Sequence, residues 1–311
     1  MDPAGVAQIS EPNCQHFCTR ATVAVTTAAR SVVTGHTLNS KITIPSLQAM
    51  KREGKKIVGV VAWDYQIARI VDRAGVDLVS VGDTVGVNLW GQSHPLEVTM
   101  EQMIVVCQAV RRGVTRALLS CDFPFGPLQE GTESAVRAAI RLVKEAGVDV
   151  IKLDGASDFP DAVTQINRAG IPVIAQFGIT PQTALRYGVA YESTPSAGSQ
   201  IPVEMTDELV AEALLLEKAG ASMLNFTNSG PIVGAAVTRA VSIPVLGGFG
   251  GGPWLDGRIR MVNSAIGYAA GALDNEPADA YANVAQIVFD AIGAYSEDVR
   301  AGRQIKGGIP A

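Results

Sequence analysis

Residues 73–83 read RAGVDLVSVGD, and residues 145–155 read EAGVDVIKLDG. Each segment joins the end of a helical pattern, an Ala-Gly pair and a short apolar run that ends in an acid. A glycine just after a helix supplies the left-handed conformation that ends it. The apolar run lacks the alternation of a half-exposed strand, so it is typical of a parallel strand with both faces covered. The two segments therefore predict βα units in a parallel α/β fold.

The same unit recurs along the chain, for example as RAGIPVIAQFG (168–178), KAGASMLNFTN (218–228) and RAVSIPVLGGFG (239–250). Strands that alternate with helical patterns of roughly 10 to 15 residues indicate repeated βα units. We predict strands at 57–63, 77–83, 117–123, 148–154, 171–177, 222–228, 243–249 and 265–271. We predict helices at 100–112, 133–146, 206–219, 254–265 and 280–300.

Eight βα units in about 250 residues match a (β/α)8 TIM barrel. A doubly wound open sheet is the alternative, but the number of units and the lack of a GxGxxG sequence after the first strand favour the barrel. We expect the barrel over residues 42–275. Residues 1–41 would form an N-terminal extension that covers the barrel or a neighbouring subunit, and residues 276–311 a C-terminal helix and tail.

The composition excludes several classes of protein. The chain has 311 residues, of which 47% are hydrophobic and 18% charged, as expected for a well-packed globular core. The net charge of −5 and the lack of a basic stripe argue against nucleic-acid binding, and no apolar run is long enough to span a membrane. Four cysteines suit a reducing compartment, so we expect a cytoplasmic protein. Cys14, His16 and Cys18 lack the second ligand pair of a zinc finger.

Acids end three of the predicted strands: Asp83, Asp122 and Asp154. The active site of a TIM barrel lies at the carboxyl ends of its strands, so these side chains should meet there. Oxygen ligands of this kind suit Mg²⁺, and the strand ends carry no histidine that would favour zinc. The alternative is that each acid caps a helix or pairs with an arginine.

Lys152 precedes Asp154 by two residues, so both side chains should face the barrel mouth. A buried lysine beside acids can bind a substrate carboxylate or stabilise an enolate, or it can merely neutralise the acids. Thr84, Gln176 and Thr227 also fall at strand ends. The glycine-rich segment GGFGGGP (247–253) suits either an anion site or a tight turn.

These segments together resemble the ketopantoate hydroxymethyltransferase family over about residues 42–275. The resemblance rests on the blocks TIPSLQAMKREGKKIVGVVAWDY, DLVSVGDTVG, LLSCDFPF, AGVDVIKLDG, IPVIAQFGITPQ, LLLEKAGASML and IPVLGGFGGGPWLDGR. It implies a barrel of the phosphoenolpyruvate-mutase/isocitrate-lyase type. It also implies Mg²⁺-dependent enolisation of a 2-oxo acid, 3-methyl-2-oxobutanoate, and one-carbon transfer from 5,10-methylenetetrahydrofolate to give 2-dehydropantoate for pantothenate synthesis. Members of the family are homo-oligomers, often decamers.

The resemblance also implies roles for individual residues. Asp83 and Asp122 match metal-binding aspartates of the family, and Asp154 stands where the family has a metal-associated glutamate. Lys152 matches the active-site lysine, and Thr84 matches a serine that holds the substrate carboxylate. We therefore expect Asp83, Thr84, Asp122, Lys152 and Gln176 to contact the substrate.

Asp154 is one departure from the family pattern, and Gly91-Gln92, where the family has Gly-His, is another; two more fall at the barrel mouth. Thr227 occupies the position of the family's catalytic glutamate, and Gln176 that of a histidine. Neither Thr nor Gln can accept a proton near neutral pH. The sequence therefore leaves open a hydroxymethyltransferase with a reassigned base, which would be a metal-bound water molecule or Lys152. It also leaves open a paralogous Mg²⁺-dependent aldolase, lyase or transferase for another 2-oxo acid, and a barrel that binds ligand without catalysis.

Overall fold

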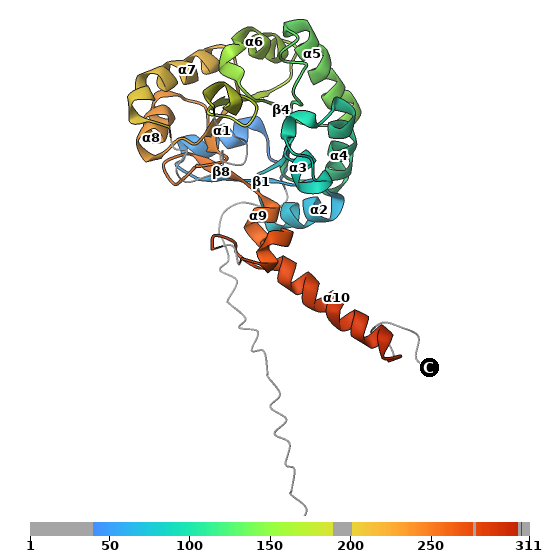
Figure 1. Ribbon diagram of the computed structural model, residues 1–311. Helices are drawn as coiled ribbons and strands as arrows, with labels where there is room; N and C mark the ends of the chain where they lie inside the picture. Colours follow the sequence, from blue (N-terminus) through green and yellow to red (C-terminus); the bar gives the residue numbers. More distant parts are fainter. Residues whose placement is uncertain (1–39, 189–200, 276–277, 304–305, 307–311) are drawn as a thin grey trace, which may run out of the picture. The chain divides into compact units, whose positions relative to one another are not determined.

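The computed structural model describes residues 40–188, 201–275, 278–303 and 306. Within these residues, eight parallel strands close into a barrel in chain order (Figure 1). They are β1 (Ile57–Val61), β2 (Leu78–Val81), β3 (Leu118–Asp122), β4 (Val150–Leu153), β5 (Val173–Gly178), β6 (Met223–Thr227), β7 (Val245–Gly247) and β8 (Gly257–Met261). The predicted (β/α)8 barrel is confirmed, and β2, β3 and β4 are buried along their whole length.

Helices surround the barrel and alternate with its strands (Figure 1). Gly75 ends one of them with φ 90°, and Gly147 ends a π-helical turn with φ 69°, as the Ala-Gly pairs predicted. The helices are α1 (Ile44–Arg52), α2 (Tyr65–Ala74), α3 (Val85–Trp90), α4 (Met100–Gly113), α5 (Thr132–Arg141), α6 (Pro160–Arg168), α7 (Thr206–Lys218), α8 (Pro231–Ala240), α9 (Val262–Ile266) and α10 (Val284–Arg300). Short turns complete the set: η1 (Pro95–Glu97), η2 (Leu142–Ala146), η3 (Ala156–Asp158), η4 (Ala184–Tyr187), η6 (Val203–Met205) and η7 (Ala270–Leu273).

The last βα unit differs from the prediction. The strand predicted at 265–271 and the helix predicted at 254–265 are wrong, because β8 spans Gly257–Met261 and α9 follows it directly. Arg258 and Arg260 interrupt the apolar run that marks the other strands. Both pair with outward positions of β1, and Val58, the partner of Arg258, is 51% exposed. Because this outer side of the wall is open to solvent, arginines are tolerated where other strands need apolar residues.

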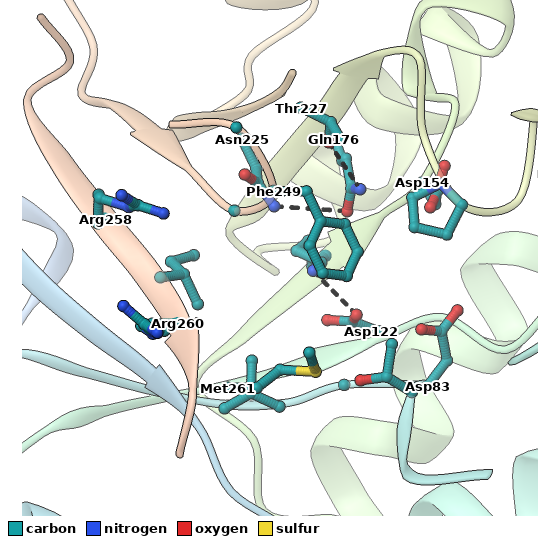
Figure 2. Close-up of a pocket in the computed structure, with 18 of the residues that line it drawn as sticks. Asp83, Asp122, Asp154, Gln176, Asn225, Thr227, Phe249, Arg258, Arg260 and Met261 are labelled. Carbon is teal, nitrogen blue, oxygen red and sulfur yellow. Dashed lines mark hydrogen bonds and ion pairs between the residues drawn. The ribbon is translucent and has the colours of Figure 1, made fainter. Parts of the chain in front are cut away.

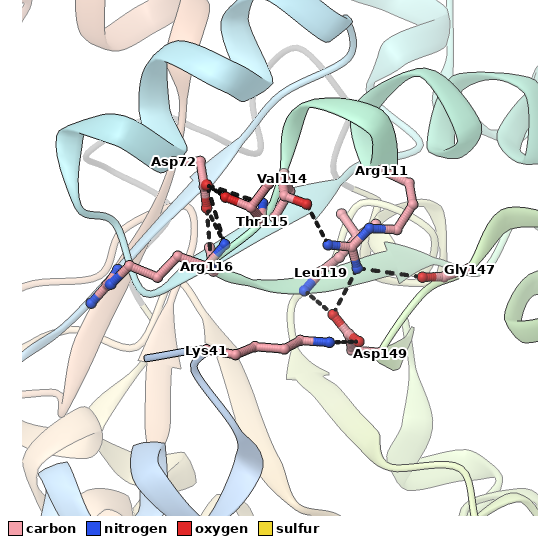
Figure 3. Close-up of polar contacts among 10 residues, drawn as sticks. Lys41, Asp72, Arg111, Val114, Thr115, Arg116, Leu119, Gly147 and Asp149 are labelled. Atoms are coloured by element: carbon pink, nitrogen blue, oxygen red, sulfur yellow. Dashed lines mark hydrogen bonds and ion pairs between the residues drawn. The ribbon is translucent and has the colours of Figure 1, made fainter. Parts of the chain in front are cut away.

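Acids also stabilise the opposite, amino-terminal end of the barrel (Figure 3). Asp72 accepts hydrogen bonds from the backbone N–H groups of Thr115, Arg116 and Ala117 at 2.8–3.2 Å. Asp149 pairs with Lys41 at 2.9 Å and Arg111 at 3.0 Å. These hydrogen bonds and ion pairs give the acids at this end of the barrel a structural role.

The C-terminal helix α10 begins at Val284, four residues after its predicted start. Its apolar side chains are largely exposed, for example Phe289 at 62% and Ile292 at 59%. In the described residues, no helix is long and apolar enough to cross a membrane. The predicted extension at 1–41 lies outside the described residues, apart from residues 40 and 41.

Candidate active site

A cavity of about 210 Å³ opens at the carboxyl ends of the strands (Figure 2). Every candidate residue taken from the sequence lines it. These residues come from five strands and the loops that follow them: Asp83, Thr84, Asp122, Lys152, Asp154, Gln176 and Thr227. All seven are buried, with exposures between 1% and 7%. The barrel thus gathers residues spread over about half of the chain, as the strand-end rule predicts.

Asp122 and Lys152 form an ion pair at the centre of the cavity. β3 and β4 pair Asp122 directly with Lys152, and Asp122 Oδ2 lies 2.9 Å from Lys152 Nζ. Ser80 Oγ donates to Asp122 Oδ1 at 3.4 Å. Because the two charged side chains are only 9% and 8% exposed, they interact in a medium of much lower polarity than water.

Gln182 connects the other two acids, although the sequence analysis assigned it no role. Its Nε2 donates to Asp83 Oδ2 at 2.9 Å and to the Phe123 carbonyl at 3.0 Å. Its backbone N–H donates to Asp154 Oδ2 at 3.4 Å. Gln182 ends the ITPQ segment after β5. This segment is part of a block that carries the family resemblance, and that membership was the only sequence feature that pointed to Gln182 as a site residue.

Burial raises the pKa of all three carboxyl groups in the cavity. Burial, with the charges of Asp122 and Asp154, raises the pKa of Asp83 to about 8. Burial raises the pKa of Asp154 to about 6, and it also raises that of Asp122. Burial by itself would lower the pKa of Lys152, but the adjacent Asp122 carboxylate outweighs it and the pKa is raised. Lys152 is therefore protonated at neutral pH.

The donor set is compatible with a divalent cation. Three carboxyl groups face one lysine, and Asp154 Oδ1 is buried without a hydrogen-bond partner. In the part of the chain that the structure describes, no three His, Cys, Asp or Glu side chains gather closely enough to hold one ion. Mg²⁺ commonly uses only one or two protein carboxylates, with water and substrate completing its shell. Asp83 and Asp122 suit such a site, and a third contact from Asp154 stays a prediction.

The side of the cavity formed by β5 and β6 carries neutral polar groups. Gln176 Nε2 donates to Thr227 Oγ1 at 3.1 Å, and Asn225 Nδ2 donates to Gln176 Oε1 at 3.4 Å. Asn225 lines the cavity too. Gln176 and Thr227, two of the predicted departures from the family pattern, are thus hydrogen-bonded to each other.

Other residues have structural roles. Trp63 is buried and its Nε1 donates to the Gly82 carbonyl at 3.1 Å. His94 lies in a loop, where its Nδ1 accepts the Leu96 N–H at 3.1 Å and caps a 3₁₀ turn. Within the glycine-rich segment after β7, Phe249 lies over the cavity (Figure 2).

The closed barrel and the buried, charged cavity at its strand ends define a (β/α)8-barrel enzyme. The chain belongs to the ketopantoate hydroxymethyltransferase family, whose profile matches residues 41–304. It is 37% identical over 264 residues to a 3-methyl-2-oxobutanoate hydroxymethyltransferase of Cyanothece sp., covering 83% of this chain and 96% of the relative. The relative from Salinibacter ruber is 37% identical over 262 residues, covering 84% and 95%.

Solved structures show the same fold at lower identity. A 2,3-dimethylmalate lyase of the PEP mutase/isocitrate lyase superfamily matches with a TM-score of 0.54 and 15% identity, covering 87% of this chain and 99% of that one. A phosphonopyruvate hydrolase in complex with oxalate and Mg²⁺ matches with a TM-score of 0.53 and 13% identity, covering 87% and 92%. The predicted barrel fold is therefore confirmed by its likeness to these structures.

Proposed function

We propose that this chain is a Mg²⁺-dependent hydroxymethyltransferase that enolises 3-methyl-2-oxobutanoate and transfers one carbon to it from 5,10-methylenetetrahydrofolate to give 2-dehydropantoate. The observation that carries the proposal is the buried Asp122–Lys152 ion pair beside Asp83, in a chain whose relatives bear this enzyme's name. The small cavity suits a short 2-oxo acid.

In this proposal, Asp83 and Asp122 hold the cation, with Asp154 nearby. Mg²⁺, when bound, supplies Lewis-acid polarisation of the 2-oxo group. Lys152, protonated because of its raised pKa, offers its N–H groups to the carboxylate or to the oxygen that gains negative charge. Thr84 lies 7% exposed at the start of α3, where its hydroxyl can donate to the substrate carboxylate.

The proton acceptor differs from the family pattern. Thr227 carries a hydroxyl, and its neighbours Gln176 and Asn225 carry neutral amides. This side of the cavity therefore cannot accept a proton near neutral pH. The raised pKa of Lys152 also argues against that residue as the base. We propose that a water molecule or one of the cavity carboxyl groups accepts the proton from C3.

Exchange of the C3 proton tests the proposal. The protein is incubated in D₂O with Mg²⁺ and 3-methyl-2-oxobutanoate, with and without 5,10-methylenetetrahydrofolate, and exchange is followed by NMR. Exchange together with folate-dependent formation of 2-dehydropantoate supports the proposal. The absence of both exchange and Mg²⁺ binding would refute it.

A second candidate is a Mg²⁺-dependent aldolase, lyase or transferase on another 2-oxo acid. The neutral β5–β6 side favours it, because that side differs from the family while the carboxylates and Lys152 are kept. Exchange without folate-dependent product, together with turnover of a different 2-oxo acid, would select this candidate.

We also propose that the protein is a homo-oligomer, and the decamer typical of the family is the first state to test. The exposed apolar side chains of α10 support a contact between subunits, because isolated helices with such surfaces are uncommon in monomers. Light scattering coupled to size exclusion measures the mass directly, and a monomer at micromolar concentration contradicts this proposal. A cytoplasmic location stays a prediction.

A further inference from the structure

Three neutral polar side chains form one buried group on the β5–β6 side of the cavity. Gln176, Asn225 and Thr227 are 5%, 3% and 1% exposed, and all three line the cavity. The strand register pairs Gln176 with Asn225, and Thr227 follows Asn225 by two residues on the same face. Polar groups buried at this depth cost stability unless each finds a hydrogen-bond partner.

The hydrogen bonds of this group leave the Asn225 oxygen, the Thr227 hydroxyl hydrogen and one N–H of each amide unused. Asn225 Nδ2 donates to Gln176 Oε1, and Gln176 Nε2 donates to Thr227 Oγ1. Asn225 Oδ1 is buried without a partner. The Thr227 oxygen accepts from Gln176, so its own hydrogen can be donated elsewhere. Glycine at 248 leaves room beside Asn225, since a Cβ there would lie 3.6 Å from Asn225 Oδ1.

A group that offers both a free acceptor and free donors is complementary to a hydroxyl group, which both donates and accepts. If the side-chain amides of Gln176 and Asn225 are both flipped, so that oxygen and nitrogen exchange places, Asn225 presents an N–H to the cavity instead. The oxygen of a ligand hydroxyl can accept that hydrogen bond equally well. The three residues themselves carry no charge, although Arg258 and Arg260 also line the cavity (Figure 2).

The position of the group relative to the acids sets the shape of the ligand. In an eight-stranded closed barrel, β6 lies opposite β2, so Asn225 faces the side that carries Asp83 across the cavity. Figure 2 shows Gln176, Asn225 and Thr227 together, apart from Asp83 and Asp122. A 2-oxo acid held by Lys152 and the acids would therefore point its side chain toward Asn225.

We propose that Gln176, Asn225 and Thr227 form a hydroxyl-binding subsite, and that Asn225 makes the protein bind a 2-oxo acid with a side-chain hydroxyl more tightly than the same acid without it. This inference rests on the proposed function, because it places the 2-oxo acid at Lys152. It assigns to the departures from the family pattern a role in binding, not in proton transfer. The hydroxymethylated product 2-dehydropantoate is one ligand that fits the description.

Two ligands that differ by one hydroxyl test the subsite. They are 4-hydroxy-3,3-dimethyl-2-oxobutanoate, which is 2-dehydropantoate, and 3,3-dimethyl-2-oxobutanoate. Neither has a hydrogen on C3, so enolisation does not disturb the measurement. Calorimetric titration in the presence of Mg²⁺ should show about tenfold tighter binding of the hydroxylated acid to the unaltered protein. Asn225→Val should reduce this ratio to about one, whereas the matched control Asn275→Val, at an exposed position outside the cavity, should keep it.

The outcomes separate this inference from the proposed function. Equal affinity for the two acids in the unaltered protein would overturn the subsite while leaving the 2-oxo acid site standing. A preference that persists in Asn225→Val would also overturn it. Failure of both acids to bind with Mg²⁺ would overturn the proposed function and the subsite together. The ratio of the two affinities for the unaltered protein tests the hydroxyl-binding subsite even if the Asn225→Val variant does not fold.

Discussion

Replacing Asp122 by asparagine is the most direct test of the cavity's chemistry. The substitution keeps the shape of the side chain and removes one negative charge from the ion pair with Lys152, whose atoms are 2.9 Å apart. It also removes one of the two carboxylates to which we assign the Mg²⁺. The structure therefore predicts two separate losses, one in stability and one in metal binding.

The expected sizes follow from the burial of the pair. Both side chains are less than 10% exposed, and breaking such a buried ion pair costs about 3–5 kcal/mol. Asp83 and Asp154 still act on Lys152, so we expect the lower end, about 3 kcal/mol. Residues that only orient a metal ligand change affinity by roughly 10- to 100-fold, so loss of a ligand itself should weaken Mg²⁺ binding by at least about 100-fold.

Calorimetric titration of Mg²⁺ with 3-methyl-2-oxobutanoate present measures the affinity, and thermal unfolding measures the stability. Asp149→Asn is the matched control, because Asp149 also pairs with two cations but lies at the amino-terminal end of the barrel. It should lose about 2 kcal/mol of stability and keep its Mg²⁺ affinity within about threefold. If Asp122→Asn also binds Mg²⁺ within about threefold of the unaltered protein, the assignment of this metal site is refuted.

Three further predictions concern pH, the amino-terminal end and the barrel closure. Asp83 has a pKa of about 8 in the folded protein against 3.8 in the unfolded chain, so the metal-free protein should lose stability as pH rises through this window, while the stabilisation by Mg²⁺ should grow. Thermal unfolding with and without Mg²⁺ between about pH 5 and pH 9 measures this, and a difference that does not vary with pH contradicts it. Burial would raise the pKa of Asp72, but its hydrogen bonds to residues 115–117 lower it overall, so its contribution is present above about pH 3.8 and lost as pH falls. Asp72→Asn should cost about 2–3 kcal/mol at neutral pH, and an unfolding temperature within about 1 °C of the unaltered protein would argue against these hydrogen bonds. Gly257→Ala should prevent normal closure of the barrel, because the added Cβ would overlap the Ile57 carbonyl, whereas Gly271→Ala, in the segment first expected to be β8, meets nothing within 4 Å and should unfold normally.

Local signals explain why most of the barrel could be predicted. Parallel strands covered on both faces need continuous apolar runs, and Gly75 and Gly147 end the preceding helices in a conformation that glycine adopts without strain. β8 was missed because Arg258 and Arg260 break its apolar run. Whether an outward position of a strand is covered or exposed depends on segments distant in the sequence, which a local pattern does not reveal.

The candidate site, like the barrel, contains residues that the sequence could predict and residues that it could not. Asp83, Asp122, Lys152 and Asp154 could be predicted because the barrel rule turns a position at a strand end into a place at the active-site mouth. Gln182 could not, since its contacts with Asp83 and Asp154 join segments 99 and 28 residues apart. The hydrogen bonds of Asn225 also depend on the register between β5 and β6, which only the closed sheet defines.

The sequence by itself determined the βα repeat, and with it the barrel and the row of acids at its mouth, because helix ends and buried strands are encoded in short segments. Only the tertiary structure decided how those acids differ. It pairs Asp122 with Lys152, raises the pKa of Asp83 to about 8 and leaves the oxygen of Asn225 without a partner. Such properties arise from burial and from charges brought together across strands, and these exist only once the barrel has closed.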